Sequence, residues 1–557
     1  EIGTAMVRAY EKDDRTAPDA GASTMKQFLG YSDPASGKDR TPAYSPDVEL
    51  YEHHVPPFRK AVEAGSSSIM INSASINGMP VHGSKRLLTG LLREELGFEG
   101  VIVSDWEDVI RLYVRHKIAE TPRDAVRIAV EAGLDMSMVP NNYSFAEYLV
   151  SLVREGEVTE ERLDESVRRI LRLKFALGLF ANAYAEPEAA ANFGLPAYRE
   201  LALRAAHESM TLLENNGVLP LSRDARVLVA GPAAHNIGAL HGSWSYTWQG
   251  KDERAYPDDT LSLVEAVSLA TGDGQISSIG SAKYDAPANV DTVVLQEAAA
   301  AADVIVLALG EHSYAESPGS IDDLSLDPAQ ENLARAAVAT GKPVVVVLLE
   351  GRPRVLGAVF DDVAAVLMAY RPGSRGAEAI TDVLYGDYNP AGVLPFTYPA
   401  ETGDILPYNR RVLADFQRRT PGAGISLDGY MPRWPFGHGL SYTTFEISDL
   451  EIDKNELRPG ESLMASVSVT NTGIRAGTRV VDLFVKDLYA SLTPSVWNLR
   501  RASRVELQPG ESKQVTFTLE VDDFSMINEE HARVTESGDF EIHVGGEVAT
   551  FRFETGQ

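Results

Sequence analysis

Short apolar runs alternate with helical patterns over the first part of the chain. The runs at 23–29, 68–72, 101–104 and 134–139 are typical of buried strands, and a segment with helical spacing follows each of them. This order predicts a βα repeat with four parallel strands, because a crossover helix returns the chain to the same side of the sheet.

The helical segment after the fourth strand has an apolar stripe. Leu163, Val167, Ile170 and Leu171 recur at the spacing of one helix face. We therefore expect this face to be buried. The pattern stops near Gly178, a residue type that commonly ends helices.

A second βα series follows residues 181–206, which begin with small and polar residues and predict a linker. Its apolar runs are nearly continuous, as in strands that helices cover on both faces. They lie at 226–231, 303–310, 343–350 and 364–370. The series predicts an open, doubly wound sheet within residues 207–445.

From about Glu446 the pattern changes to short strands in which apolar and polar residues alternate. Pro-Gly and Asn-Thr-Gly turns separate the runs at 462–469, 479–485, 514–519 and 538–544. Alternation over roughly a hundred residues predicts an immunoglobulin-like or fibronectin-like β-sandwich. We assign it to residues 446–557.

The composition excludes several classes of function. The net charge of −29 argues against nucleic acid as a partner and makes anionic polymers poor substrates. The chain has no cysteine, so it has no disulfide, thiolate metal site or thiol nucleophile. Its apolar runs are far shorter than the roughly eighteen residues of a membrane span, so we expect no membrane partner.

Asp105 directly follows the apolar run at 101–103. In a barrel of parallel strands, the carboxyl end of each strand faces the catalytic mouth, so a carboxylate there is a candidate catalytic group. An Asp after a strand is also a common helix N-cap. From the residues alone both interpretations stay open.

The histidines give no metal site. His53 and His54 are adjacent and so do not share a helix face, which makes them a poor pair of ligands. The chain has neither a His-x-x-x-His motif nor an acidic calcium loop. We therefore expect no metal.

Five segments in order along the chain resemble glycoside hydrolase family 3, the β-glucosidase and exo-glucanase family. They are GFEGVIVSDW at 97–106, RRILRLKFALGLF at 168–180, LLENNGVLPL at 212–221, GDYNPAGVLP at 386–395 and FGHGLSYTTF at 436–445. The resemblance implies a multidomain α/β fold with a (β/α)8 TIM-type barrel, an α/β sandwich and a fibronectin type III-like domain. Residues 1–180 would then be the C-terminal half of the barrel, since the family's barrel needs about four more strands before Glu1.

The resemblance also implies a retaining, exo-acting β-glucosidase that needs no cofactor. Retention requires two carboxyl groups about 5 Å apart, one attacking the anomeric carbon and one protonating the leaving oxygen. Asp105 takes the place of the nucleophile. The acidic loop after Gly310 resembles the acid/base loop of the exo-glucanase branch, which places that role on Glu316, with Glu311 as second choice. Asp322 or Asp323 is the third.

Three further residues are candidates for substrate binding. Trp106 and Trp248 resemble the tryptophan pair that holds a sugar in the exo-glucanase branch; packing within the protein is the alternative for both. Lys26 matches the Lys of the family's Lys-His-Phe motif, although it can also be an ordinary surface lysine. Gln27 replaces the histidine of that motif, so the hydroxyl contact of the histidine is either made by an amide or lost.

Other functions remain compatible with the same sequence. A β-xylosidase or another β-glycosidase would keep the fold, because no residue fixes the hydroxyl at C6. A carbohydrate-binding remnant without activity is the alternative from another class, since a half-barrel exposes strand edges. The expected partners are a β-glucoside or β-glucan oligosaccharide, and either a companion polypeptide that supplies the first half of the barrel or a second copy in a homodimer. A periplasmic or extracellular location follows from the resemblance only.

Overall fold

The structure is a computed structural model that divides into two compact units. The first is Glu1–Phe193 with Met526–Arg533, and the second is Gly194–Ser525 with Val534–Gln557. The residues described are 1–184, 187–271, 276–279, 292–404, 407–411, 418–420, 424–426 and 430–555. The predicted domain bounds stay predictions; residues 181–206, which we expected to be a linker, include most of helix α8 (Pro196–Ser209).

The first unit is built on a small parallel sheet in the order β1-β2-β5. Its strands are β1 (Thr24–Phe28), β2 (Ser68–Ile71) and β5 (Val101–Val103), as the apolar runs predict. The fourth run pairs with β5 only through a bridge at Met136. The side chain of Asp135 accepts a hydrogen bond from the backbone of Ile102 at 3.0 Å, so it takes a position that a regular strand would fill with its backbone.

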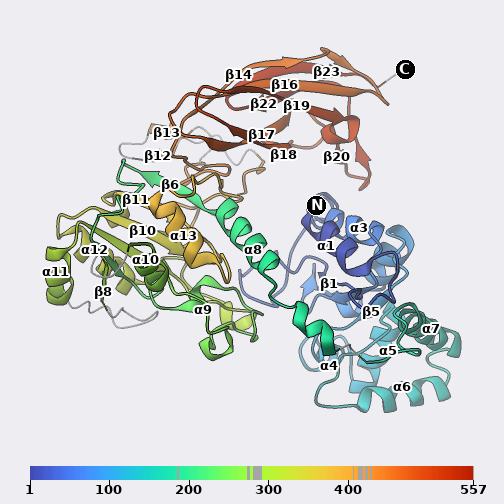
Figure 1. Ribbon diagram of the computed structural model, residues 1–557. Coiled ribbons are helices and arrows are strands. Elements are labelled where there is room, and N and C mark those ends of the chain that lie inside the picture. Colours follow the sequence, from blue (N-terminus) through green and yellow to red (C-terminus); the bar gives the residue numbers. More distant parts are fainter. Residues whose placement is uncertain are drawn as a thin grey trace. The chain divides into compact units, whose positions relative to one another are not determined.

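Helices surround this sheet (Figure 1). Helix α5 begins where the sequence favours it, because Pro122 occupies its first turn and the Thr121 hydroxyl accepts from the backbone of Asp124 at 3.0 Å. Within the described ranges, no helix of either unit is both long and apolar enough to span a bilayer. The helices are α1 (Ile2–Glu11), α2 (Asp47–Glu49), α3 (Val55–Glu63), α4 (Asp108–Val114), α5 (Pro122–Ala132), α6 (Ser144–Arg154) and α7 (Glu160–Ala176), with shorter or π-helical turns at η1 (Leu50–His54), η2 (Val81–Gly83), η3 (Arg86–Glu95) and η4 (Pro187–Asn192), and a hairpin of β3 (Ser75–Ile76) and β4 (Met79–Pro80).

Helix α7 contacts its unit through polar residues, so the prediction of a buried apolar stripe was wrong. Val167 and Leu171 are 43% and 39% exposed. Instead, Ser166 is buried and donates to Asp135 Oδ1 at 2.8 Å, and Arg169 donates to the same oxygen at 2.9 Å. The spacing marked the apolar face of α7 correctly, and Leu163 and Ile170 on it are half-buried, but the bonds to Asp135 come from the adjacent face that carries Ser166 and Arg169.

The second unit contains a six-stranded sheet in the order β6-β11-β10-β9-β7-β8. Five strands are parallel, and β6 runs antiparallel to β11. The order of the parallel strands reverses direction between β7 and β9, which is the topological switch point at which ligands bind in sheets of this kind. The strands are β6 (Thr211–Asn215), β7 (Val227–Ala230), β8 (Ile276–Ser278), β9 (Val304–Gly310), β10 (Val344–Leu349) and β11 (Ala365–Met368).

Both faces of this sheet are buried. Along β10, Val345 and Val347 join the core under α10 and α13, while Val344 and Val346 join the core under α11 and α12. This arrangement confirms the predicted doubly wound sheet (Figure 1). The remaining helices are α9 (Ile237–Leu240), α10 (Leu263–Thr271), α11 (Thr292–Ala301), α12 (Pro328–Val338) and α13 (Gly376–Tyr385), with short turns at η5 (Glu253–Ala255), η6 (Ser317–Gly319) and η7 (Ala358–Asp361).

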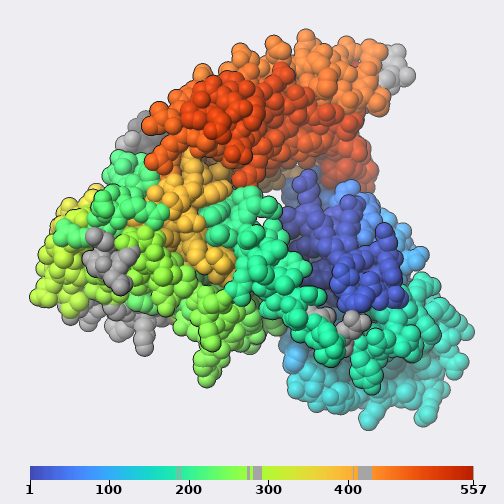
Figure 2. All heavy atoms as spheres, in the orientation of Figure 1, coloured from blue at the N-terminus to red at the C-terminus, as the bar shows by residue number. Residues whose placement is uncertain are grey.

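The C-terminal residues form the predicted β-sandwich. Sheets of order β14-β16-β19 and β15-β23-β22-β17-β18 enclose one apolar core. The space-filling view shows its side chains, coloured orange to red, as one continuous mass (Figure 2). Its strands are β14 (Phe445–Ile452), β15 (Glu456–Leu457), β16 (Ser462–Asn471), β17 (Gly477–Asp487), β18 (Asn498–Leu507), β19 (Ser512–Glu520), β22 (Gly538–Val544) and β23 (Glu547–Phe553); the second unit also has η8 (Val521–Phe524) and the pair β12 (Arg418–Thr420) and β13 (Gly424–Ser426), and β20 (Met526–Ile527) pairs with β21 (Arg533–Val534).

Candidate active site

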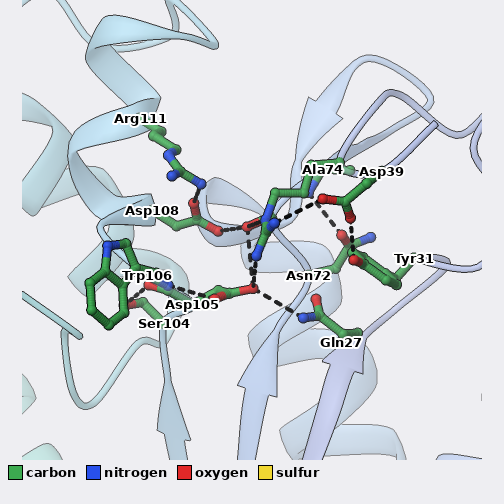
Figure 3. A network of polar contacts seen from close by, with 12 residues as sticks. Gln27, Tyr31, Asp39, Asn72, Ala74, Ser104, Asp105, Trp106, Asp108 and Arg111 are labelled. Carbon is green, nitrogen blue, oxygen red and sulfur yellow. Dashed lines mark hydrogen bonds and ion pairs between the residues drawn. The ribbon is translucent and has the colours of Figure 1, made fainter. Parts of the chain in front are cut away.

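Asp105 lies two residues beyond the carboxyl end of β5 and is only 6% exposed. Its Oδ1 accepts from the backbone of Trp106 at 2.6 Å, and its Oδ2 accepts from Gln27 Nε2 at 3.0 Å. The hydroxyl of Ser73 donates to Oδ2 at 3.4 Å. Figure 3 shows the Asp105 carboxylate between Gln27 on one side and Trp106 on the other. The side chain is therefore held in place by donors from three different segments.

The surroundings of Asp105 favour the charged carboxylate. Arg40 Nη2 lies 3.5 Å from Oδ2. Burial acts to raise the pKa of Asp105, but the hydrogen bonds from Gln27 and Trp106 and the charges of Arg40 and Lys26 outweigh burial and lower that pKa below its ordinary value. Asp105 is thus ionised at neutral pH, as an attacking carboxylate must be.

A second layer of polar residues positions this carboxylate. Arg40 donates to Asp39 at 2.8 Å and to Ser73 at 3.3 Å. Ser73 also bonds Asp108, which accepts from Arg111 at 2.7 Å. The one proton of the Ser73 hydroxyl can go to either Asp105 or Asp108, so Ser73 links the Arg40 side of the site to the Asp108 side.

His82 supports Asp105 through the backbone. Its Nε2 lies 3.3 Å from the backbone nitrogen of Asp105 and accepts from it, so the ring proton belongs on Nδ1, which is 3.8 Å from Asp108. Burial lowers the pKa of His82, which keeps the ring neutral. Sequence reasoning missed Arg40, Ser73, Asp108 and His82, because they come from loops and helix starts without periodic pattern.

Two candidates for substrate binding lie beside Asp105. Lys26 is exposed on β1, and its charge contributes to the lowered pKa of Asp105. The side chain of Trp106 is 50% exposed, so its ring is open to a ligand. Both roles remain predictions.

Gln27 does more than replace a histidine. Its φ of 63° lies in the left-handed region, and the β1–β2 register slips between Met25 and Phe28. Such an irregularity re-aims a side chain, and here the amide of Gln27 points to Asp105. The amide thus acts on the nucleophile candidate itself.

In the second unit, Glu316 and Glu311 both follow β9, beside the switch point. Glu311 is nearly buried; it accepts from the backbones of Gly351 and Arg352 at 3.2 Å each, and its Oε2 lies 3.2 Å from Arg352 Nε. These donors hold the Glu311 carboxylate in a fixed position. Glu316 is half-buried, has a φ of 57° and directly precedes η6. This contrast favours Glu316 over Glu311 as the residue that exchanges a proton, and the role stays a prediction.

The loop of Glu316 is joined to the loop of Trp248. The Gln249 amide donates to the carbonyl of Ala315 and accepts from its backbone N–H, both at 3.1 Å. Ser313 donates to the backbone carbonyl of Gln249 at 2.8 Å. Trp248, which is 46% exposed, is therefore fixed one residue away from the contact that fixes Glu316.

Asp322 and Asp323 are exposed further along the same loop. The backbone N–H of Ser325 donates to Asp323 at 2.8 Å and lowers the pKa of this carboxyl. A group that loses its proton so readily is a poor general acid, in keeping with its place as the last choice.

Glu350 is a titratable residue at the carboxyl edge of the six-stranded sheet, and sequence reasoning missed it. It follows β10 and is fully buried, which raises its pKa to about 8, with a contribution from the charge of Glu311. Tyr398 has two acceptors within reach, Glu350 Oε1 at 2.9 Å and the carbonyl of Arg354 at 2.8 Å. One hydroxyl proton serves only one of them, so a protonated Glu350 that donates to Tyr398 leaves the Tyr398 hydroxyl free to donate to the carbonyl of Arg354.

The part of the chain that the structure describes holds no group of three or more His, Asp or Glu side chains arranged to bind a metal. His53 lies 3.4 Å from Glu49, and His54 lies 3.9 Å from Asp33. Each histidine thus faces a different carboxylate.

Comparison with known proteins finds matching family models, relatives and solved structures. Three family models match it: the glycosyl hydrolase family 3 N-terminal domain over residues 1–173, the family 3 C-terminal domain over 210–442 and the fibronectin type III-like domain over 479–548. A lysosomal beta glucosidase of Dictyostelium discoideum is 41% identical over 98% of this chain and 68% of its own length. A beta-xylosidase of Formosa agariphila is 33% identical over 94% of this chain and 73% of its own length. The beta-glucosidase of Listeria innocua, solved with laminaribiose, superposes with a TM-score of 0.90 at 31% identity, over 100% of this chain and 77% of that one.

Proposed function

This chain belongs to glycosyl hydrolase family 3 and is a glycoside hydrolase, and we propose that it releases terminal β-D-glucosyl residues from β-glucosides or short β-glucans with retention. The names of its relatives support glucose as the sugar, since one at 41% identity and two at 31% are β-glucosidases. The observation that carries the proposal is the buried, ionised Asp105 at the carboxyl end of β5.

In the proposed mechanism a carboxylate oxygen of Asp105 attacks the anomeric carbon. The glycosidic C–O bond breaks as Glu316 gives its proton to the leaving oxygen, which yields a glycosyl-enzyme ester. Glu316 then takes a proton from water, whose oxygen attacks the same carbon and frees Asp105. The mechanism requires both carboxyl groups to face one anomeric carbon about 5 Å apart.

The remaining polar groups would serve this chemistry. Gln27 and Arg40 hold Asp105 in its charged form before attack. Lys26 would bind a hydroxyl of the sugar that Asp105 attacks. Trp106 and Trp248 would offer their exposed rings to the apolar faces of sugar units.

A β-xylosidase is the second candidate, because a relative with 33% identity carries that name. The experiment is to compare initial rates on aryl β-glucoside and aryl β-xyloside, and to follow by NMR which anomer of the sugar appears first. We expect faster release of glucose, first as the β-anomer. Preferential release of xylose would change the sugar, and α-anomer first would refute retention. Glucose binding without turnover would indicate a carbohydrate-binding remnant.

We further propose that polypeptide covers the exposed apolar residues of the first unit. Ile2, Met6 and Tyr10 on α1 are exposed, as are Val167 and Phe175 on α7. Patches of this kind mark interaction sites. A companion polypeptide that supplies further barrel strands is the partner we expect, and a homodimer is the alternative. Native mass spectrometry distinguishes the two, and a monomer of this chain alone with these faces accessible to solvent would refute both.

A further inference from the structure

The fibronectin type III-like domain carries a pocket of its own. It has a volume of about 270 Å³ and is lined by Phe436, Arg479, Asp482, Phe484, Trp497 and His543, among others. All these residues belong to the second unit. On β17, the intervening Val481, Leu483 and Val485 fill the core of the sandwich. The pocket is also lined by Val544 of the core and by Ile447 of the three-stranded sheet, so it lies where the outward side chains of β17 meet the edge of the core.

Two charged side chains in the pocket lack partners. Among the described residues, neither the Asp482 carboxylate nor Nε of Arg479, which is buried, has a hydrogen-bond partner, and the two side chains form no ion pair with each other. Burial raises the pKa of Asp482, although the charge of Arg479 opposes the change. Buried polar groups are nearly always paired, so the buried, unpaired Nε of Arg479 and the half-buried Asp482 carboxylate leave a donor and an acceptor for a ligand in one pocket.

The aromatic side chains of the pocket hold one another in place. Trp497 meets the ring of His543 edge to face at 4.4 Å, and Phe484 meets Trp497 in the same way at 5.8 Å. His543 is fixed in turn by Glu541 at 2.9 Å. Trp497 and Phe484 are only half-buried, so they present rigid ring surface to the pocket.

We propose that this pocket binds one pyranose ring of a neutral saccharide, apart from the catalytic residues. Asp482 would accept hydrogen bonds from two ring hydroxyls, Arg479 would donate to another, and Trp497 or Phe484 would cover the apolar face of the ring. The opposite charges of Asp482 and Arg479 cancel, so a neutral ligand fits better than an anion. The volume lies slightly below the range of sites for drug-sized ligands, which suits a single ring. The choice of glucose as this ring rests on the proposed function.

The test is hydrogen–deuterium exchange of the full chain with and without saturating D-glucose. We expect glucose to protect backbone amides around 479–485 and 496–499. Sorbitol is the matched control, because it has the hydroxyls of glucose but no ring face, and it should protect neither segment. No protection there, or equal protection by sorbitol, would overturn the proposal.

Two variants separate binding from folding. Asp482→Leu removes a half-buried carboxylate without a hydrogen-bond partner among the described residues, so it should fold at least as stably as the parent chain while weakening glucose protection about tenfold or more. Trp497→Phe keeps a ring and should weaken protection less. Both should leave hydrolysis of an aryl β-glucoside unchanged. If Asp482→Leu destabilises the sandwich and leaves glucose protection intact, the carboxylate is structural and the proposal fails.

The outcomes also distinguish this site from the proposed function. Protection of 479–485 without any glucosidase activity would leave the pocket standing and refute the activity. Glucosidase activity without protection of that segment would support the activity and refute the saccharide pocket.

Discussion

Asp105 and Glu350 are both buried carboxyl groups just beyond the carboxyl ends of parallel strands, yet their surroundings favour opposite protonation states. Asp105 receives hydrogen bonds from Gln27 and Trp106 and lies near the charges of Arg40 and Lys26, and its pKa is lowered. Glu350 has a pKa raised to about 8, and its Oε2 is buried without a hydrogen-bond partner among the described residues.

The difference shows that position in the fold does not set the chemistry of a carboxyl group. Burial acts on both groups in the same direction, so the donors decide the outcome. Asp105 is prepared to attack as an anion. Glu350 is neutral at pH 7, and a neutral acid is a structural hydrogen-bond donor to Tyr398.

Replacement of Asp105, the charged carboxyl group of the two, should have the largest effect on activity. Asp105→Asn keeps the shape but removes the nucleophile, so we expect kcat on an aryl β-glucoside to fall by about four orders of magnitude or more. Steady-state kinetics measures the loss, and circular dichroism checks that the fold is kept. Asp322→Asn, in an exposed position, is the matched control and should retain activity; turnover by Asp105→Asn near the parental rate would refute its role.

Glu316→Ala should have the next largest effect, and the effect should depend on the leaving group. Substrates with poor leaving groups need protonation and should slow by about a hundredfold or more, while activated aryl glucosides should slow less. Glu311→Gln is the matched variant on the same loop. If Glu311→Gln shows the leaving-group dependence and Glu316→Ala shows a uniform loss, the roles of the two residues are exchanged.

Glu350→Gln tests whether Glu350 is neutral, by its effect on the pH dependence of the free energy of unfolding. In the native state the pKa of Glu350 is about 8, whereas its ordinary value is 4.5. Between pH 4.5 and pH 8 the native state therefore holds a proton that the unfolded chain has lost. Stability therefore falls as pH rises from about 4.5 through about 8, by an amount on the order of a few kcal/mol. Glutamine can still donate to Tyr398, so the variant should lack this fall and be the more stable protein above pH 8.

Differential scanning calorimetry between pH 5 and pH 9 measures this comparison. Glu297→Gln on the exposed face of α11 is the control and should follow the parent chain at every pH. Parallel stability curves for the Glu350 variant and the parent would show that Glu350 is charged in the native state.

Gln27→Leu should have the smallest effect and acts on Asp105 alone. Loss of the donated hydrogen bond raises the pKa of Asp105, so the acidic limb of kcat/KM should move to higher pH. Activity would then be lost earlier as pH falls, while the rate at neutral pH changes little. An unchanged acidic limb would mean that the amide of Gln27 does not set the charge of Asp105.

Much of the fold follows from local pattern. The strands around Asp105 and around Glu311 are apolar runs, and periodicity identifies them without knowledge of the rest of the chain. The family resemblance and the fold class that it implies are confirmed by the family matches and by the Listeria innocua enzyme. Periodicity failed in part at α7, because Ser166 on the adjacent face bonds Asp135, 31 residues away, while Val167 and Leu171 stay exposed.

The charge state of each carboxyl group could not be predicted in this way. The donors to Asp105 come from Gln27 and Ser73, which are 78 and 32 residues away in the chain. Arg40 lies in a loop with no periodic signal. Glu350 becomes neutral only because it is buried at the end of β10, beside Glu311 at the end of β9. Such information resides in contacts between distant segments and not in any window of sequence.

The most direct measurement is to trap the glycosyl-enzyme. The full chain is incubated with a 2-deoxy-2-fluoro-β-D-glucoside that carries a good leaving group, digested and analysed by mass spectrometry. We predict a single sugar label, attached as an ester to Asp105 and absent from Asp105→Asn. A label on another carboxylate, or hydrolysis that proceeds with no label on Asp105, would contradict the assignment of Asp105 as the nucleophile.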